Sequence, residues 1–154
     1  QTCALPIYPD NSFIHLVLRT RRGIPISLAV IWLELAQGLG LDAEGVNFPG
    51  HFLVKVHLSE PRQGQVVIDP FTGESLGRDE LLERVQSMAT PVHRERHQDP
   101  DDVLLAHLTP ATGRDIIWRM LRNLEEIYRA QGDTRRMAAV RARIDVMRET
   151  ADQD

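Results

Sequence analysis

His51 and Asp69 are the residues whose types and positions best suit acid–base chemistry in this sequence. His51 begins the apolar run 51–58, and Asp69 directly follows the run 65–68. A carboxylate beside an imidazole can orient it as a general base. The same two residues can instead form a structural pair that pins one strand to the next. With Asn47 nearby they can also hydrogen-bond a bound peptide without cleaving it.

His93 and His97 are a second candidate pair, because i, i+4 spacing can place two metal ligands on one helix face. Glu95, Asp99 and Asp101 lie close in the sequence. The surrounding residues are rich in charge and proline, and no motif fixes a further ligand. A solvated loop is therefore the better interpretation, and we expect no metal site and no cofactor.

The elements that must position the candidate residues are one long helix and a small sheet. Residues 23–40 have the pattern of a buried helix, with Pro25 in the first turn and Gly40 at a left-handed stop. A shorter helix capped by Ser12 is expected to precede it. Three short strands are predicted over residues 43–48, 51–58 and 65–68. The sequence thus indicates an α+β fold with a central helix on a small antiparallel sheet.

The rest of the chain has helical patterns. Leucine spacing predicts a short amphipathic helix over 77–87, and the proline-rich, charged residues 90–108 suggest a linker. Residues 109–150 carry two apolar stripes separated by Gly132-Asp133, which predicts an antiparallel helical hairpin. We expect these stripes to be packing surface.

Composition excludes several functional classes. The chain is 42% hydrophobic with a net charge of −4, which argues against a general nucleic-acid binder. No apolar run approaches the roughly 20 residues of a membrane-spanning helix. Cys3 is the only cysteine, and this fits a reducing cytoplasm. Residues 1–7 can be translated from a common sequencing-adapter sequence, so we interpret them as a non-native artefact and exclude them from the fold.

Three phrases in order, GIPISLA at 23–29, NFPGHF at 47–52 and VIDPF at 67–71, resemble the core of the SirB-type transglutaminase-like family. The phrase RMLRNLEEIYRAQGD at 119–133 resembles the helix that follows this core. The resemblance implies a transglutaminase-like (papain-like) domain over 8–89, truncated at its N-terminus. It also implies that the hairpin is tetratricopeptide-like.

The resemblance also assigns roles to the candidate residues. The family has a cysteine nucleophile at the start of its central helix, with a histidine base and an orienting aspartate. Its pattern Gly-x-Cys-x-x-x-Ala, matched to residues 23–29, puts Pro25 at the cysteine position and leaves His51 and Asp69 in the other two. Ser27 is the nearest hydroxyl. It lies about 200° further around the helix, so the preferred interpretation is a small residue that allows close helix packing, or a hydroxyl bonded to the preceding turn.

The missing nucleophile favours a non-catalytic, cytoplasmic module that binds or regulates a protein or peptide. We assign Asn47, His51, Asp69 and Phe71 to the binding surface, and the hairpin to a second one. Two alternatives stay open. One is an amide hydrolase, protease or transamidase that uses Ser27 or water with His51 and Asp69, and the other is a scaffold for the helices. The partner and the oligomeric state are not predicted.

Overall fold

The computed structural model describes residues 8–59, 63–88 and 99–149. In this part of the chain, α-helices surround a four-stranded antiparallel sheet with the order β1-β2-β3-β4. The strands are β1 (Ala43–Val46), β2 (Leu53–Leu58), β3 (Gly64–Ile68) and β4 (Ser75–Leu76). The α+β class and the three predicted strands are confirmed. The two-residue β4 carries no periodic signal, and the sequence did not predict it.

The N-terminal helices are η1 (Pro9–Ser12), α1 (Ile14–Thr20) and α2 (Pro25–Gly38). The central helix is confirmed with its signals, because Pro25 lies in its first turn and Gly40 has a φ of +72°. Ser12 does not cap α1. It ends η1 with its side chain buried, and Phe13 occupies the N-cap position.

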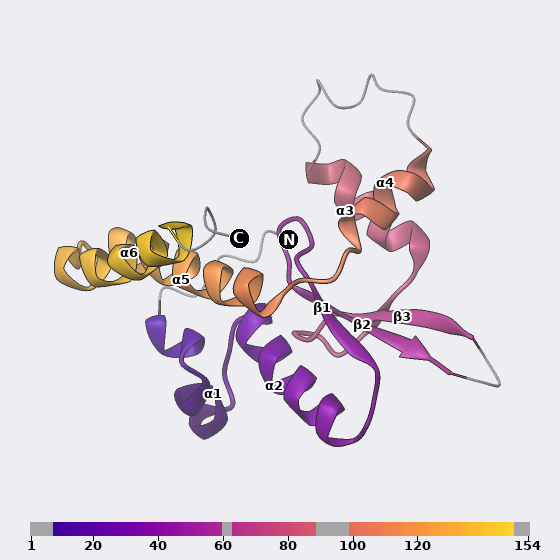
Figure 1. The fold of residues 1–154 in the computed structure, drawn as a ribbon, viewed down its shortest axis with the longest axis horizontal. Helices are drawn as coiled ribbons and strands as arrows, with labels where there is room; N and C mark the ends of the chain where they lie inside the picture. The colour runs from indigo at the N-terminus through magenta and orange to yellow at the C-terminus, as the bar shows by residue number, and fades with distance from the viewer. Residues whose placement is uncertain (1–7, 60–62, 89–98, 150–154) are drawn as a thin grey trace.

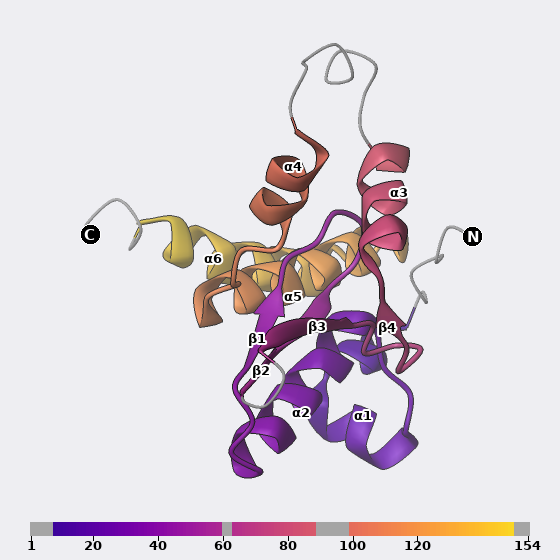
Figure 2. The same ribbon diagram turned by 90° about the vertical axis from the view of Figure 1, so that its right-hand side faces the viewer.

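The two faces of the sheet are covered by different helices (Figures 1 and 2). Alternate residues of a strand point to opposite faces. On β2, Val54 and Val56 join the apolar cluster of α2, whereas Leu53 joins the cluster of α3 (Arg78–Met88) and α4 (Pro100–His107). Buried on both faces, β2 is the central support of the fold.

Helix α4 shortens the predicted linker. Asp99 caps this helix by accepting a hydrogen bond from the amide of Asp101, and Pro100 occupies its first turn. Its residues Leu104 and Leu108 are buried in the α3-side cluster. The linker predicted over 90–108 therefore does not extend beyond residue 99, because a capped helix with an apolar face begins there.

The C-terminal helices α5 (Gly113–Ala130) and α6 (Thr134–Glu149) form the predicted hairpin. The hairpin is joined to the core. Ile116 and Met120 of α5 pack against the α2-side cluster, and the amide of Ala111 donates a 2.7 Å hydrogen bond to the carbonyl of Gly45 on β1. Helix α5 thereby comes close to the β1–β2 turn. None of the described helices combines the length and the apolarity needed to cross a membrane.

Candidate functional site

His51 lies in the turn that joins β1 to β2. Its amide donates a 3.1 Å hydrogen bond to the carbonyl of Phe48, and Gly50 has a φ of +69°. A side chain at residue 50 would be strained by this φ. Its Cβ would also lie 2.6 Å from Met88 Sδ of α3. Gly50 therefore closes the turn tightly and fixes the direction in which His51 leaves it.

Asp69 lies where β3 ends, and the strand register brings it near His51. Val54 pairs with Ile68, so the beginning of β2 lies beside the end of β3. The Asp69 side chain is only 2% exposed. Its Oδ1 accepts a 2.9 Å hydrogen bond from the amide of Phe71, and its own amide donates one of 2.9 Å to the carbonyl of Glu74. The β3–β4 turn is thus folded around this carboxylate.

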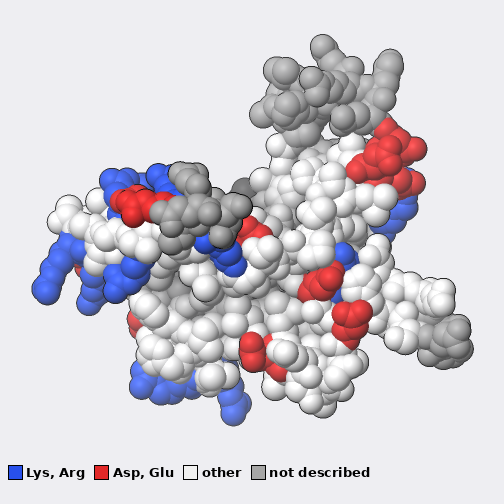
Figure 3. All heavy atoms as spheres, in the orientation of Figure 1, with Lys and Arg blue, Asp and Glu red and all other residues white. Residues whose placement is uncertain are grey.

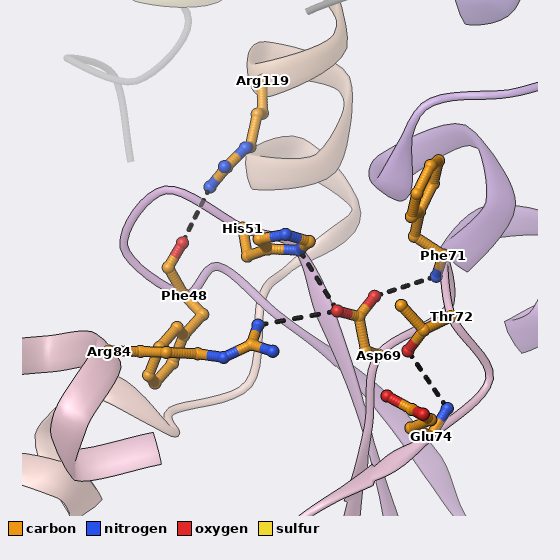
Figure 4. Close-up of polar contacts among 8 residues, drawn as sticks. All are labelled: Phe48, His51, Asp69, Phe71, Thr72, Glu74, Arg84 and Arg119. Carbon is orange, nitrogen blue, oxygen red and sulfur yellow. Dashed lines mark hydrogen bonds and ion pairs between the residues drawn. The ribbon is translucent and has the colours of Figure 1, made fainter. Parts of the chain in front are cut away.

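The imidazole of His51 faces the carboxylate of Asp69 (Figure 4). His51 Nδ1 and Asp69 Oδ2 are 3.8 Å apart, which is too long for a hydrogen bond. His51 Nδ1 is buried without a hydrogen-bond partner among the described residues. Burial is the largest cause of a lowered pKa for His51, and the nearby Asp69 only partly opposes it. We therefore expect a neutral imidazole near pH 7.

Two arginines that the sequence analysis missed complete this arrangement. Arg84 of α3 places Nη1 3.5 Å from Asp69 Oδ2. Arg119 of α5 donates from Nη1 to the carbonyl of Phe48 at 3.3 Å and to Asn47 Oδ1. Both positive charges further lower the pKa of His51. The site is therefore built from the sheet and from two helices that lie far apart in the sequence.

One sequence signal was present for Arg119. It lies three residues after Ile116 and directly before Met120, on the apolar side of its helix, where an arginine is unusual. Arg84 carried no such signal, because it belongs to a helix rich in charged residues. Its contact with Asp69 depends on how α3 packs.

The four predicted binding residues are in different environments. Asn47 is connected to His51 through Arg119 and the Phe48 carbonyl, and His51 faces Asp69, which Arg84 also contacts. Phe71 contacts Asp69 through its amide, and the residue is 52% exposed. These positions are compatible with a contact surface, and their role in binding stays a prediction.

Ser27 is placed apart from this network. It is fully buried, and its Oγ donates a 2.7 Å hydrogen bond to the carbonyl of Asn11 and accepts one of 3.0 Å from the amide of Ile24. None of its described hydrogen bonds involves His51 or Asp69. The structure thus shows Ser27 joining α2 to η1.

Pro25 occupies the first turn of α2. Its two neighbours, Ile24 and Ile26, are buried in the same apolar cluster as Phe52, the residue that follows His51. The first turn of α2 therefore packs near the site. Among the described residues no group of three His, Cys, Asp or Glu side chains could hold a metal ion. His93 and His97 lie outside these residues, as do residues 1–7.

The lowered pKa of His51 predicts how stability depends on pH. The unfolded chain takes up a proton at this residue near pH 6.5 and the folded protein only at a lower pH, so protonation favours unfolding. The stabilisation is complete above pH 6.5 and lost as pH falls through the folded-state pKa. Urea unfolding between pH 7.5 and 5.5 should therefore show a smaller loss of stability for His51→Gln than for the parent protein. His15→Gln, at an exposed position, is the matched control, and an equal loss in all three proteins contradicts the prediction.

Comparison with known proteins adds a family context to this geometry. Residues 6–122 match the protein family described as the transglutaminase-like superfamily. A UPF0162 protein of Xylella fastidiosa is 44% identical over 122 residues, which cover 78% of this chain and 40% of that protein. A UPF0162 protein of Pseudomonas aeruginosa is 33% identical over 128 residues, or 83% of this chain and 43% of that protein.

A shorter match connects the chain with a eukaryotic protein. F-box only protein 21 of Homo sapiens is 49% identical over 45 residues, which cover 29% of this chain and 7% of that protein. The chain spans about 40% of the length of the two bacterial relatives. No solved structure matches the chain significantly.

Proposed function

The chain belongs to the transglutaminase-like superfamily, and within this family we propose that it binds a protein or peptide without cleaving it. The observation that carries the proposal is Pro25 at the position where the family pattern has its cysteine. A proline ring has neither a thiol nor a hydroxyl, so it cannot attack a carbonyl carbon. The nearest hydroxyl, that of Ser27, is buried and hydrogen-bonded to Asn11 and Ile24.

The polar groups around His51 support a binding role. The His51 side chain is 22% exposed, and Asn47 beside it is exposed. Together they offer a partner both donors and acceptors for hydrogen bonds. Asp69, Arg84 and the Phe48 turn hold these groups in place. A preformed set of this kind suits recognition of a peptide amide.

Finer parts of the proposal rest on the resemblance. We propose that the protein is of the SirB type, that the hairpin α5–α6 is tetratricopeptide-like, and that the module acts as a regulator in the cytoplasm. We also propose the hairpin as a second contact surface, because Ile117 and Val146 are exposed on it. For the full-length protein, peptide binding is likewise our proposal.

Amide hydrolysis or transamidation is the second candidate function. Its specific support is His51, whose lowered pKa keeps the imidazole neutral and able to accept a proton from water. Asp69 lies beside Nδ1 of His51, where its negative charge can stabilise the imidazolium that forms. In hydrolysis a water molecule takes the place of the missing thiol, and in transamidation the acceptor amine attacks the amide carbonyl directly and the original amine leaves.

One set of assays separates the two functions. Peptide hydrolysis and glutamine transamidation are measured on a broad panel, and capture of random octapeptides on the immobilised protein is measured in parallel. We expect no turnover above background, and capture that is lost in His51→Ala but kept in His15→Ala. The loss follows because alanine removes the hydrogen-bonding ring from the centre of the site.

Turnover that His51→Ala abolishes would overturn the binding proposal in favour of the hydrolase. Absence of any peptide capture by the folded parent protein would overturn it as well. Circular dichroism of each variant verifies that a lost signal reflects the site and not unfolding.

A further inference from the structure

Arg119 is a half-buried cation without a carboxylate partner in the part of the chain that the structure describes. None of the ion pairs found there includes it. Its hydrogen-bond acceptors are the neutral oxygens of Asn47 and Phe48, and its guanidinium lies 6.0 Å from the centre of the Phe52 ring. Burial lowers the pKa of Arg119. Charged groups removed from water are normally paired, because desolvation without a partner is costly.

The free edge of this guanidinium has the geometry of an anion receptor. Both of its hydrogen bonds to described residues leave from Nη1. Nε and Nη2 make none there. These two nitrogens form the planar fork that binds a carboxylate through two parallel hydrogen bonds. The turn at Asn47 and Phe48 holds the guanidinium by its other side and so orients the fork.

The surroundings of Arg119 have an excess of positive charge. Arg84 approaches the His51–Asp69 pair from another side (Figure 4), and its side chain is 37% exposed. Arg84 pairs with the carboxylate of Asp69 at 3.5 Å, no carboxylate of the described residues pairs with Arg119, and burial favours a neutral His51. One positive charge therefore remains uncompensated. A ligand with one negative charge would neutralise it.

We propose that Arg119 binds a carboxylate of the peptide partner, so that the peptide recognised beside His51 is acidic. The carboxylate is an Asp or Glu side chain or a free C-terminus, since both present the same two oxygens. This inference rests on the proposed peptide-binding function and adds its specificity. The guanidinium of Arg119 lies over the Phe52 ring, so we expect the anion to bind at the edge formed by Nε and Nη2.

General attraction by surface arginines is the competing explanation. Figure 3 shows Lys and Arg side chains gathered over the end of the molecule formed by α5 and α6. Arg143 is an exposed arginine of α6 whose Nη1 donates a 2.7 Å hydrogen bond to the carbonyl of Ala139 within its own helix. Removing its charge lowers the general attraction as much as removing that of Arg119. Arg143→Gln is therefore the matched control.

The test uses four pools of N-acetylated random octapeptides. The pools contain or lack Asp and Glu, and they end in a carboxylate or an amide. Capture on the immobilised parent protein is quantified by mass spectrometry. We expect the parent protein to capture about tenfold more peptide from at least one pool with a carboxylate than from the neutral, amidated pool. This ratio corresponds to one charge-assisted pair. The comparison between the two C-termini and between the two compositions identifies the source of the carboxylate.

The variants then assign the effect to one residue. Arg119→Gln should reduce capture of the preferred pool to the level of the neutral pool. Arg119→Lys and Arg143→Gln should still capture more peptide from the carboxylate pool than from the neutral pool. Equal capture of all pools by the parent protein overturns the acidic-peptide inference and leaves peptide binding intact. Equal losses in Arg119→Gln and Arg143→Gln also overturn it. Capture of no pool overturns the peptide-binding function itself.

Discussion

A Pro25→Cys variant is expected to gain a thiol that iodoacetamide alkylates at pH 7 about tenfold faster than an ordinary cysteine. Residue 25 lies in the first turn of α2, where the helix dipole favours the thiolate. Ile24 and Ile26 pack in one cluster with Phe52, which brings this turn near His51. A thiol in such a setting has a pKa of about 3.5–7.5 instead of about 8.5. The fold should tolerate the change, because losing a compatible proline costs only about 0.4–1 kcal/mol.

The measurement needs a background without other thiols. Cys3→Ser provides it, since Cys3 is the only cysteine of the chain. Gly113→Cys is the control for the helix dipole alone, because residue 113 begins α5 and a Cβ there meets nothing within 4 Å. Alkylation rates from pH 5 to 9 give the thiol pKa of each variant.

The outcomes separate the effect of the histidine from that of the helix. Addition of His51→Ala to Pro25→Cys should raise the thiol pKa toward about 8.5. If Pro25→Cys titrates like Gly113→Cys, and His51→Ala does not change it, then residue 25 does not face His51. The assignment of Pro25 to the nucleophile position would then be wrong. Peptide hydrolysis gained by Pro25→Cys would show that only the thiol was missing.

The candidate pair was predictable because its signals are local. His51 follows a Pro-Gly turn and begins a strand, and Asp69 ends the next strand. Antiparallel pairing of neighbouring strands then brings the two residues together without any knowledge of the helices. The central helix was predictable for a similar reason, since proline and glycine mark its ends.

The contacts of Arg84 and Arg119 were not predictable from such signals. They depend on how α3 and α5 pack on the sheet. In the sequence, α3 precedes and α5 follows the segment that was predicted to be a linker. Helix α4 shows the same limit. The sequence contains two signals for the start of this helix, Asp99 as its cap and Pro100 in its first turn. The many charged residues around them nevertheless favoured a linker. Burial of Leu104 and Leu108 decides in favour of the helix.

Helix α5 connects the turn that carries His51 with the C-terminal hairpin. Helix α5 carries both Arg119, which contacts the His51 turn, and Glu125, which holds α6. A substitution that weakens the contact between α5 and α6 is therefore expected to affect the helix that carries Arg119. Glu125 is the residue of α5 that tests this contact.

Glu125→Ala is expected to destabilise the protein by about 2–3 kcal/mol. Glu125 is 1% exposed, and its carboxylate lies within 3.2 Å of nitrogens of Arg122, Arg129 and Arg141. Alanine leaves three guanidiniums close together without their shared anion. The expected loss is below that of a fully buried pair, because these arginines are 42–57% exposed and can turn to water.

Urea unfolding followed by circular dichroism measures this loss. Glu126→Ala, at the exposed next position, is the matched control and should change stability by less than about 0.5 kcal/mol. The shared carboxylate also predicts that Glu125→Ala and Arg141→Ala are less than additive, since each removes the same contact between α5 and α6. Equal effects of Glu125→Ala and Glu126→Ala would contradict the prediction. Such a result would mean that apolar packing, and not the arginine cluster, holds the hairpin and the helix that carries Arg119.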